Sequence, residues 1–184
     1  MTHAEMPAYP ADVLERAARV RLFGFDVDGT LTDGRLHYGT DGHEAKSFHV
    51  QDGMGITLLR RAGIVLALVT ARISPVVERR GRELQIAHVH THERSKLACM
   101  QRIAAGMGIG MDAVAFMGDD LPDLATLRNA GLAIVPANAH PWVKPAAHWV
   151  TPRNGGEGAA RDACDLVLQA RGEIDAILEH GEHP

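Results

Sequence analysis

Four stretches of the chain are almost continuously apolar and have the length of a strand. They are residues 20–27 (VRLFGFDV), 64–70 (IVLALVT), 113–118 (AVAFMG) and 132–136 (LAIVP). Unbroken apolarity, in contrast to alternation, is typical of strands that are buried on both faces of a parallel sheet. The pattern therefore predicts four strands of one parallel sheet.

Segments with helical spacing separate these strands. They cover about residues 52–62, 74–84, 93–106 and 121–129, and a further one at about 158–179 predicts a C-terminal helix. Strands that alternate with helices indicate an α/β fold, a doubly wound Rossmann-like sheet with right-handed crossovers. The chain shows no repeat and no linker, so we expect residues 1–184 to form a single domain.

One segment interrupts the alternation. Residues 35–50 hold two short β-like pieces on either side of Gly39, Asp41 and Gly42, a pattern that predicts a β-hairpin. Because this segment follows the first strand directly, we expect it to stand over the ends of the strands as a flap at about residues 32–50.

Composition narrows the class of protein. The 184 residues are 46% hydrophobic and 23% charged, as in ordinary globular proteins, and carry a net charge of -4 with 4% aromatic residues, which argues against nucleic-acid binding. No apolar run is long enough to span a membrane, and the first twenty residues do not look like a secretory signal. Two cysteines, Cys99 and Cys164, do not make a disulfide framework, so we expect a cytoplasmic protein.

Polar residues follow three of the apolar runs, and a lysine lies near the start of a predicted helix. Because ligands of a doubly wound sheet bind beyond the carboxyl ends of its strands, these residues are expected at one edge. They are Asp26 and Asp28 after the first run, Thr70 and Arg72 after the second, Asp119 and Asp120 after the third, and Lys96.

The acidic residues predict a metal site. Asp26 and Asp28 are one residue apart and repel each other unless a cation lies between them or one holds a proton. Together with Asp119 they can hold Mg²⁺, a hard ion that takes oxygen ligands. Asp28 can contribute a backbone carbonyl, which would leave its carboxyl group free for proton transfer.

A carboxylate, a metal, a hydroxyl and a lysine suit phosphoryl transfer through an aspartyl-phosphate intermediate. Asp26 would attack phosphorus, while Asp28 would protonate the leaving oxygen and later take a proton from water. Thr70 would donate a hydrogen bond to a phosphoryl oxygen, and Lys96 would offset negative charge.

Structural interpretations compete with these functional ones. The acidic residues can cap helices or form turns, but three carboxylates in one place still need a cation, so we prefer the catalytic interpretation. His88, His90 and His92 would share a face of an extended segment and suggest a second metal site. We favour a structural role for them, because no acidic or cysteine partner stands at a ligand spacing.

The motifs DVDGT, VTAR and GDDLPD, with Lys96 between the last two, resemble the four motifs of the haloacid dehalogenase superfamily of phosphatases in their order. The longer stretches FHVQDGMGI, KLACMQRI and GGEGAARDACDLVL resemble the 3-deoxy-D-manno-octulosonate 8-phosphate phosphatase family, a group without a cap domain. The resemblance covers about residues 12–178.

This resemblance implies a Mg²⁺-dependent homotetramer in which hairpins of four subunits pack together and a neighbour helps to cover each site. It also implies that Asp120 and Asp123 orient water ligands or Lys96, and that Lys46 and Arg72 bind the anionic sugar.

The expected activity is hydrolysis of 3-deoxy-D-manno-octulosonate 8-phosphate in lipopolysaccharide precursor synthesis. One alternative is a phosphatase for a nine-carbon sugar-acid 9-phosphate, such as a sialic-acid-like one. Another is a non-catalytic binding protein of the same fold, which would be expected to lack at least one catalytic residue, and this chain lacks none.

Overall fold

The computed structural model describes residues 7–40, 42 and 44–180 of the chain. Within this part, six parallel strands form one sheet in the order β5-β4-β1-β6-β7-β8. The strands are β1 Leu22–Phe25, β4 Val65–Val69, β5 His88–His90, β6 Val114–Met117, β7 Leu132–Val135 and β8 Trp149–Val150. The predicted doubly wound α/β fold is confirmed.

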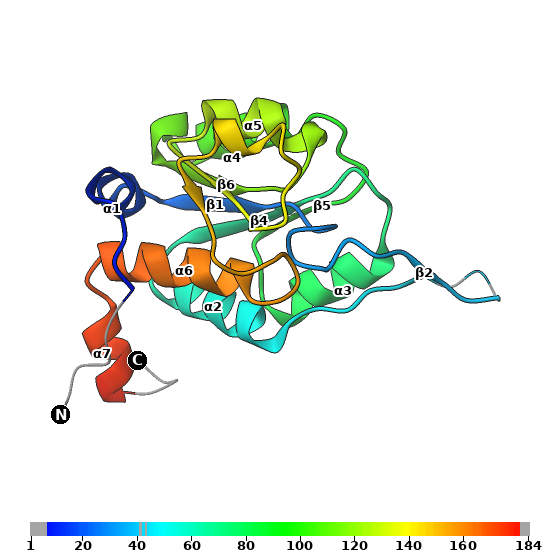
Figure 1. Ribbon diagram of the computed structural model, residues 1–184, viewed down its shortest axis with the longest axis horizontal. Coiled ribbons are helices and arrows are strands. Elements are labelled where there is room, and N and C mark those ends of the chain that lie inside the picture. The colour runs from blue at the N-terminus through cyan, green and yellow to red at the C-terminus, as the bar shows by residue number, and fades with distance from the viewer. Residues whose placement is uncertain (1–6, 41, 43, 181–184) are drawn as a thin grey trace.

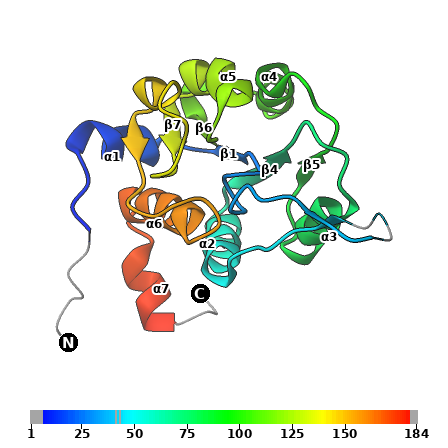
Figure 2. The same ribbon diagram turned by 45° about the vertical axis from the view of Figure 1, so that its right-hand side comes forward.

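Helices cover both faces of the sheet (Figures 1 and 2). On one face, α2 and α6 pack side by side, with α1 against α6 and α3 nearby; α4 and α5 lie on the other face. The helices are α1 Ala11–Ala18, α2 Val50–Arg61, α3 Pro75–Glu83, α4 Lys96–Gly106, α5 Leu124–Asn129, α6 Ala159–Ala170 and α7 Ile174–His180, and short 3-10 turns are η1 Met111–Ala113, η2 Leu121–Asp123 and η3 Lys144–Ala146.

The central strand β1 shows why its sequence is apolar throughout. Phe23 and Phe25 pack into the core below α2 and α6, whereas Leu22 packs into the core below α4. Gly24 faces α4, where a Cβ atom would lie 2.6 Å from the sulfur of Met100. Both faces of β1 are therefore buried, and glycine allows α4 to pack closely on it.

The segment after β1 forms the predicted hairpin. Strands β2 (His37–Tyr38) and β3 (Glu44–Ala45) pair antiparallel with each other and with no strand of the main sheet in the described residues. In Figure 1 this flap extends beyond the sheet, at the right of the view, before the chain enters α2.

Three elements of the fold escaped prediction. The edge strands β5 and β8 and the helix α1 were not expected, since β5 has the sequence HVH and β8 has only two residues. The prediction of one C-terminal helix over 158–179 was wrong. Helix α6 ends at Ala170, and Gly172 adopts a φ of +71°, a left-handed conformation that ends helices, before α7 begins.

No described helix is long and apolar enough to cross a membrane. Cys99 and Cys164 are both buried free thiols.

Candidate active site

The strand order places a ligand cleft between β1 and β6. From β1 the chain continues to β4 on one side, and it later returns to β6 on the other side of β1. Such a reversal opens a crevice at the carboxyl ends of the two strands. The cleft found there is lined by Asp26, Asp28, Gly29, Gly34, Thr70, Ala71, Arg72, Lys96, Asp119, Asp120, Pro122 and Asp123.

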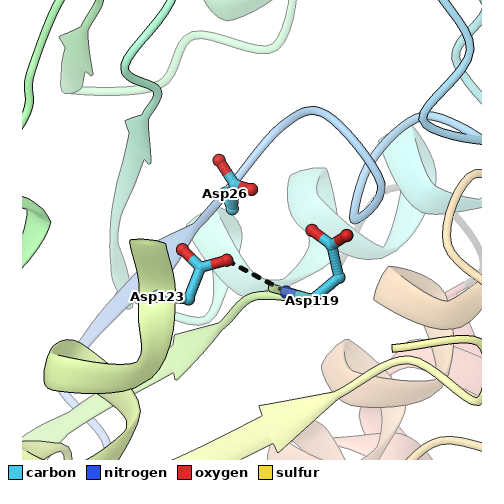
Figure 3. Close-up of side chains that lie close together, drawn as sticks. All are labelled: Asp26, Asp119 and Asp123. Carbon is cyan, nitrogen blue, oxygen red and sulfur yellow. Dashed lines mark hydrogen bonds between the residues drawn. The ribbon is translucent and has the colours of Figure 1, made fainter. Parts of the chain in front are cut away.

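Three of these residues form a carboxylate cluster. Oxygen atoms of Asp26, Asp119 and Asp123 lie within 4.8 Å of one another. Figure 3 shows the three side chains close together at the ends of their elements. Asp26 directly follows β1, Asp119 comes two residues after β6, and Asp123 ends the turn η2. Asp26 and Asp123 are buried, so water screens their charges little.

Lys96 partly balances this cluster. As the first residue of α4, it places its Nζ atom 2.7 Å from Oδ1 of Asp26 and 2.6 Å from Oδ1 of Asp123. Burial disfavours the charged lysine, but the two carboxylates outweigh burial and raise the pKa of Lys96. One cation faces three carboxylates, so the cluster keeps an excess of negative charge.

Burial, together with the excess negative charge, raises the pKa of two of the acids. Burial, with repulsion from Asp123, raises the pKa of Asp26 well above its ordinary range even though Lys96 opposes the shift. The same two causes raise the pKa of Asp119 to about 6. A divalent cation that binds oxygen would stabilise the ionised forms of both groups, and Mg²⁺ fits this donor set.

Hydrogen bonds distinguish the members of the cluster. Oδ1 of Asp123 accepts from Lys96, and Oδ2 accepts from the backbone N–H groups of Asp119 (3.0 Å) and Asp120 (3.2 Å). Both Asp123 oxygens are therefore used within the protein. The Asp120 side chain accepts from the backbone N–H of Leu121 at 2.7 Å and caps η2. Asp26 and Asp119 remain the carboxylates best placed for a cation.

The side chain of Asp28 points to a different part of the cleft. Its Oδ1 forms an ion pair with Lys46, and its Oδ2 accepts a hydrogen bond from the Thr70 hydroxyl at 3.5 Å. The Asp28 carboxylate is thus outside the cluster, and a contact of Asp28 with a metal would come from its backbone carbonyl. Its carboxyl group stays available for proton transfer.

The flap supplies ion pairs at the outer side of the cleft. The Arg72 guanidinium donates to Oε1 of Glu44 at 2.6 Å and to the Tyr38 hydroxyl at 3.1 Å. Lys46, with a side chain only 1% exposed, also lies 3.5 Å from Oε1 of Glu44. Every predicted site residue except Lys46 lines the cleft, and Lys46 contacts the lining residue Asp28.

The histidine run shows no metal site. His88 and His90 lie on β5 with their rings stacked 6.1 Å apart, and His92 follows with a φ of +59°. Among the described residues, the group of three or more side chains able to hold a metal consists of aspartates from the cleft.

Comparisons with known proteins agree with this geometry. A family model described as haloacid dehalogenase-like hydrolase matches residues 82–161. The chain is 39% identical to the 3-deoxy-D-manno-octulosonate 8-phosphate phosphatase of Yersinia pestis over 89% of this chain and 88% of the relative. This degree of identity over nearly the full length decides the family. The chain belongs to the 3-deoxy-D-manno-octulosonate 8-phosphate phosphatase family.

Solved structures support the membership. A hypothetical protein from Xanthomonas campestris matches with a TM-score of 0.94 and 49% identity, over 98% of this chain and 99% of the other. A 3-deoxy-D-manno-octulosonate 8-phosphate phosphatase from Moraxella catarrhalis, in complex with magnesium, phosphate and 3-deoxy-D-manno-octulosonate, matches with a TM-score of 0.91. It is 37% identical over 93% of this chain and 98% of the other.

The C-terminal stretch that resembles this family contacts the loop after β1. A Cβ atom on Gly155 would lie 1.8 Å from the carbonyl oxygen of Gly29, and the Gly156 N–H donates to the Thr30 carbonyl at 3.1 Å. The glycines therefore allow one backbone to pack directly on the other. Arg161, from the same stretch, pairs instead with Asp165 on α6 at 2.7 Å.

Sequence reasoning missed two residues of the site. The Thr30 hydroxyl donates to Oδ1 of Asp119 at 3.2 Å, which connects the loop after β1 to the one after β6. Its place in the DVDGT motif was a usable signal. Glu44 stands two residues before Lys46, and this spacing puts both side chains on one face of an extended segment.

Proposed function

We propose that this protein is a Mg²⁺-dependent phosphatase that hydrolyses 3-deoxy-D-manno-octulosonate 8-phosphate to the free sugar acid and phosphate, in lipopolysaccharide precursor synthesis. The observation that carries the proposal is the carboxylate cluster around Lys96 at the junction of β1 and β6. The sugar-acid substrate is that of its curated relatives, and the Moraxella structure binds the corresponding product.

Asp26 is the proposed nucleophile. One of its carboxylate oxygens attacks phosphorus, the bond between phosphorus and the sugar oxygen breaks, and the phosphoryl group is carried on Asp26. Asp28 gives a proton to the departing sugar oxygen. Water then attacks phosphorus and gives a proton to Asp28, and the bond between phosphorus and Asp26 breaks.

Neighbouring groups position and neutralise the reacting atoms. The Thr70 hydroxyl, now near Asp28, donates to a phosphoryl oxygen when substrate is bound. Lys96 holds Asp26 in place and offsets charge on the phosphoryl group. Asp123 holds Lys96 and the backbone of the loop that carries Asp119.

The proposed ligands of Mg²⁺ are the carboxylates of Asp26 and Asp119 and the backbone carbonyl of Asp28. When bound, the ion neutralises the excess negative charge of the cluster and that of the phosphoryl oxygens. Lys46 and Arg72 are proposed to contact the anionic sugar acid, for which Arg72 has to exchange part of its pairing with Glu44.

We also propose that residues 1–184 act as one domain, that the protein is a homotetramer built through the flaps, and that it works in the cytoplasm. The exposed apolar residues Leu36 and Tyr38 on the flap support the assembly, because such side chains are favoured at interfaces. The buried free thiols support a reducing compartment. The native mass in solution tests the assembly.

The test of the activity is phosphate release from a panel of sugar phosphates that includes eight- and nine-carbon sugar-acid phosphates. With Mg²⁺ present, the highest kcat/KM is expected for 3-deoxy-D-manno-octulosonate 8-phosphate, and a chelator should abolish release. A preference for a nine-carbon sugar-acid phosphate would revise the proposed substrate, while the proposed phosphatase mechanism would stand. No Mg²⁺-dependent release from any phosphate ester would overturn the proposal.

A further inference from the structure

Glu44 contacts three residues at the outer side of the cleft. Its Oε1 accepts from Arg72 at 2.6 Å and lies 3.5 Å from Nζ of Lys46, and its Oε2 accepts from the Ser74 hydroxyl at 3.4 Å. The Glu44 side chain is 16% exposed. A single flap carboxylate thus contacts both cations proposed for substrate binding and Ser74, the residue that precedes α3.

Lys46 connects Glu44 to the proposed acid/base. Its buried ammonium group lies between the carboxylates of Asp28 and Glu44. A buried ammonium needs partners in several directions, and a single partner leaves its long side chain free to rotate around one contact. Glu44 supplies the second contact, so the position of Lys46 against Asp28 depends on it.

Arg72 depends on Glu44 in the same way. Its backbone N–H donates to the Thr70 hydroxyl at 3.2 Å, while its guanidinium reaches across to the flap. Besides Glu44, the guanidinium contacts the uncharged Tyr38 hydroxyl. Glu44 is therefore the charged group that draws the Arg72 side chain toward the flap.

We propose that Glu44 is a positioning residue, which holds Lys46 against Asp28 and Arg72 beside Thr70 and so fixes the outer half of the active site. The inference rests on the proposed phosphatase function. Glu44 itself is not placed near the reacting atoms, since it does not line the cleft and acts through Lys46 and Arg72.

The charges are consistent with this role. Asp28 and Glu44 balance Lys46 and Arg72. Among the carboxylates that the structure describes, removal of the Glu44 charge leaves Asp28 as the partner of Lys46. Although partial burial disfavours ionisation, the hydrogen bond from Arg72 and the charge of Lys46 keep the pKa of Glu44 below its ordinary value. Glu44 is therefore ionised at neutral pH.

The test is Glu44→Gln, assayed with Mg²⁺ on a series of aryl phosphates whose leaving groups differ in acidity. Misplacement of Asp28 should lower kcat by about tenfold or more for the poorest leaving groups, which need a proton most, and less for p-nitrophenyl phosphate. The dependence of rate on leaving-group acidity becomes steeper. This slope does not depend on the fraction of folded enzyme.

The matched control is Glu78→Gln, the same change at an exposed glutamate of α3 that contacts Thr91. It should leave both rate and slope unchanged. In a Lys46→Met background, Glu44→Gln should lower kcat by a smaller factor than it does in the wild type, because the effect of Glu44 through Lys46 is already lost.

An unchanged slope in Glu44→Gln would overturn the inference, whether the rates match the wild type or fall equally for all leaving groups. The inference would also be overturned if Glu44→Gln lowered kcat by the same factor in the Lys46→Met background as in the wild type. A wild-type protein that releases phosphate from no ester would instead overturn the proposed function, so the two failures are distinct.

Discussion

The two halves of the cleft are built differently. In the inner half, Asp26, Lys96 and Asp123 are buried, and each is attached to a strand end or to the first turn of a helix. In the outer half, the flap consists of two-residue strands, and the Tyr38 side chain that contacts Arg72 is exposed. The ion pairs of the inner half join buried residues of the main fold, whereas those of the outer half join the flap to the loops after β1 and β4.

This difference indicates a division of work. Buried charges in a fixed frame act strongly on a reacting group, because little water screens them and they need not reorganise. The ion pair of Arg72 with Glu44 is partly exposed, and such a pair can exchange partners when a ligand binds. We therefore assign the nucleophile and charge neutralisation to the inner half, and proton transfer through Asp28 together with the choice of sugar to the outer half.

Asp26→Asn should give the largest effect. Loss of the nucleophile should lower kcat by roughly 10⁴-fold or more on every phosphate ester. The melting temperature without metal should not fall, because the raised pKa of Asp26 means that its ionised form is unfavourable in the fold. Asp175→Asn, at an exposed site on α7, is the control for both assays.

Activity of Asp26→Asn near that of the wild type, measured on purified protein, would remove Asp26 as the nucleophile. It would also remove the assignment of the nucleophile to the inner half.

Lys96→Met should lower both activity and stability. It leaves Asp26 and Asp123 buried without a cation, a change that typically costs about 3–5 kcal/mol. We expect kcat to fall by roughly 10²-fold or more and Mg²⁺ to restore part of the lost stability. Chemical denaturation with and without Mg²⁺ measures the change in stability. A variant as stable as the wild type in the absence of metal would show that Lys96 does not balance the cluster.

Arg72→Ala should separate the two halves. For the sugar-acid phosphate, KM should rise by about tenfold, because a charge-assisted contact with the substrate is lost. For p-nitrophenyl phosphate, which has no sugar acid, kcat/KM should change little. Equal losses on both substrates would place Arg72 in the chemical step and would contradict its role in the choice of sugar.

The smallest expected effect is a pH dependence of metal binding. Without metal, the raised pKa of Asp119 contributes stability below its ordinary value of 3.8, and this contribution is lost as the pH rises through about 6. A cation favours the ionised form, so Mg²⁺ should raise the melting temperature more at about pH 7.5 than at about pH 5. Equal shifts at both pH values would exclude Asp119 as a ligand that titrates in this range.

Much of the inner half could be predicted from the sequence. Continuous apolar runs mark the four strands β1, β4, β6 and β7, and the rule for parallel sheets brings Asp26, Thr70 and Asp119 to one edge. The edge strand β5 could not be recognised, because histidines occupy both of its ends. The break at Gly172 was missed because apolar spacing continues across it.

Individual side-chain contacts in both halves were harder to predict. The spacing of residues does not show that Asp28 turns from the cluster toward Lys46, or that Asp123 uses one oxygen for backbone N–H groups. These contacts depend on how the flap and the loop after β6 fold back over the sheet. The contacts of Glu44 could not be predicted for the same reason, because its partners lie on other elements.

The most direct test of the account is to locate the phosphoryl group during turnover. With p-nitrophenyl phosphate, whose leaving group needs a proton least, Asp28→Asn should slow hydrolysis of the intermediate more than its formation. Borohydride reduction of the quenched protein would then convert a phosphorylated aspartate to homoserine. Mass spectrometry of the resulting peptides should find homoserine at position 26 and at no other aspartate. Homoserine at another position, or a fully active Asp26→Asn variant, would contradict the assignment of Asp26 as the nucleophile.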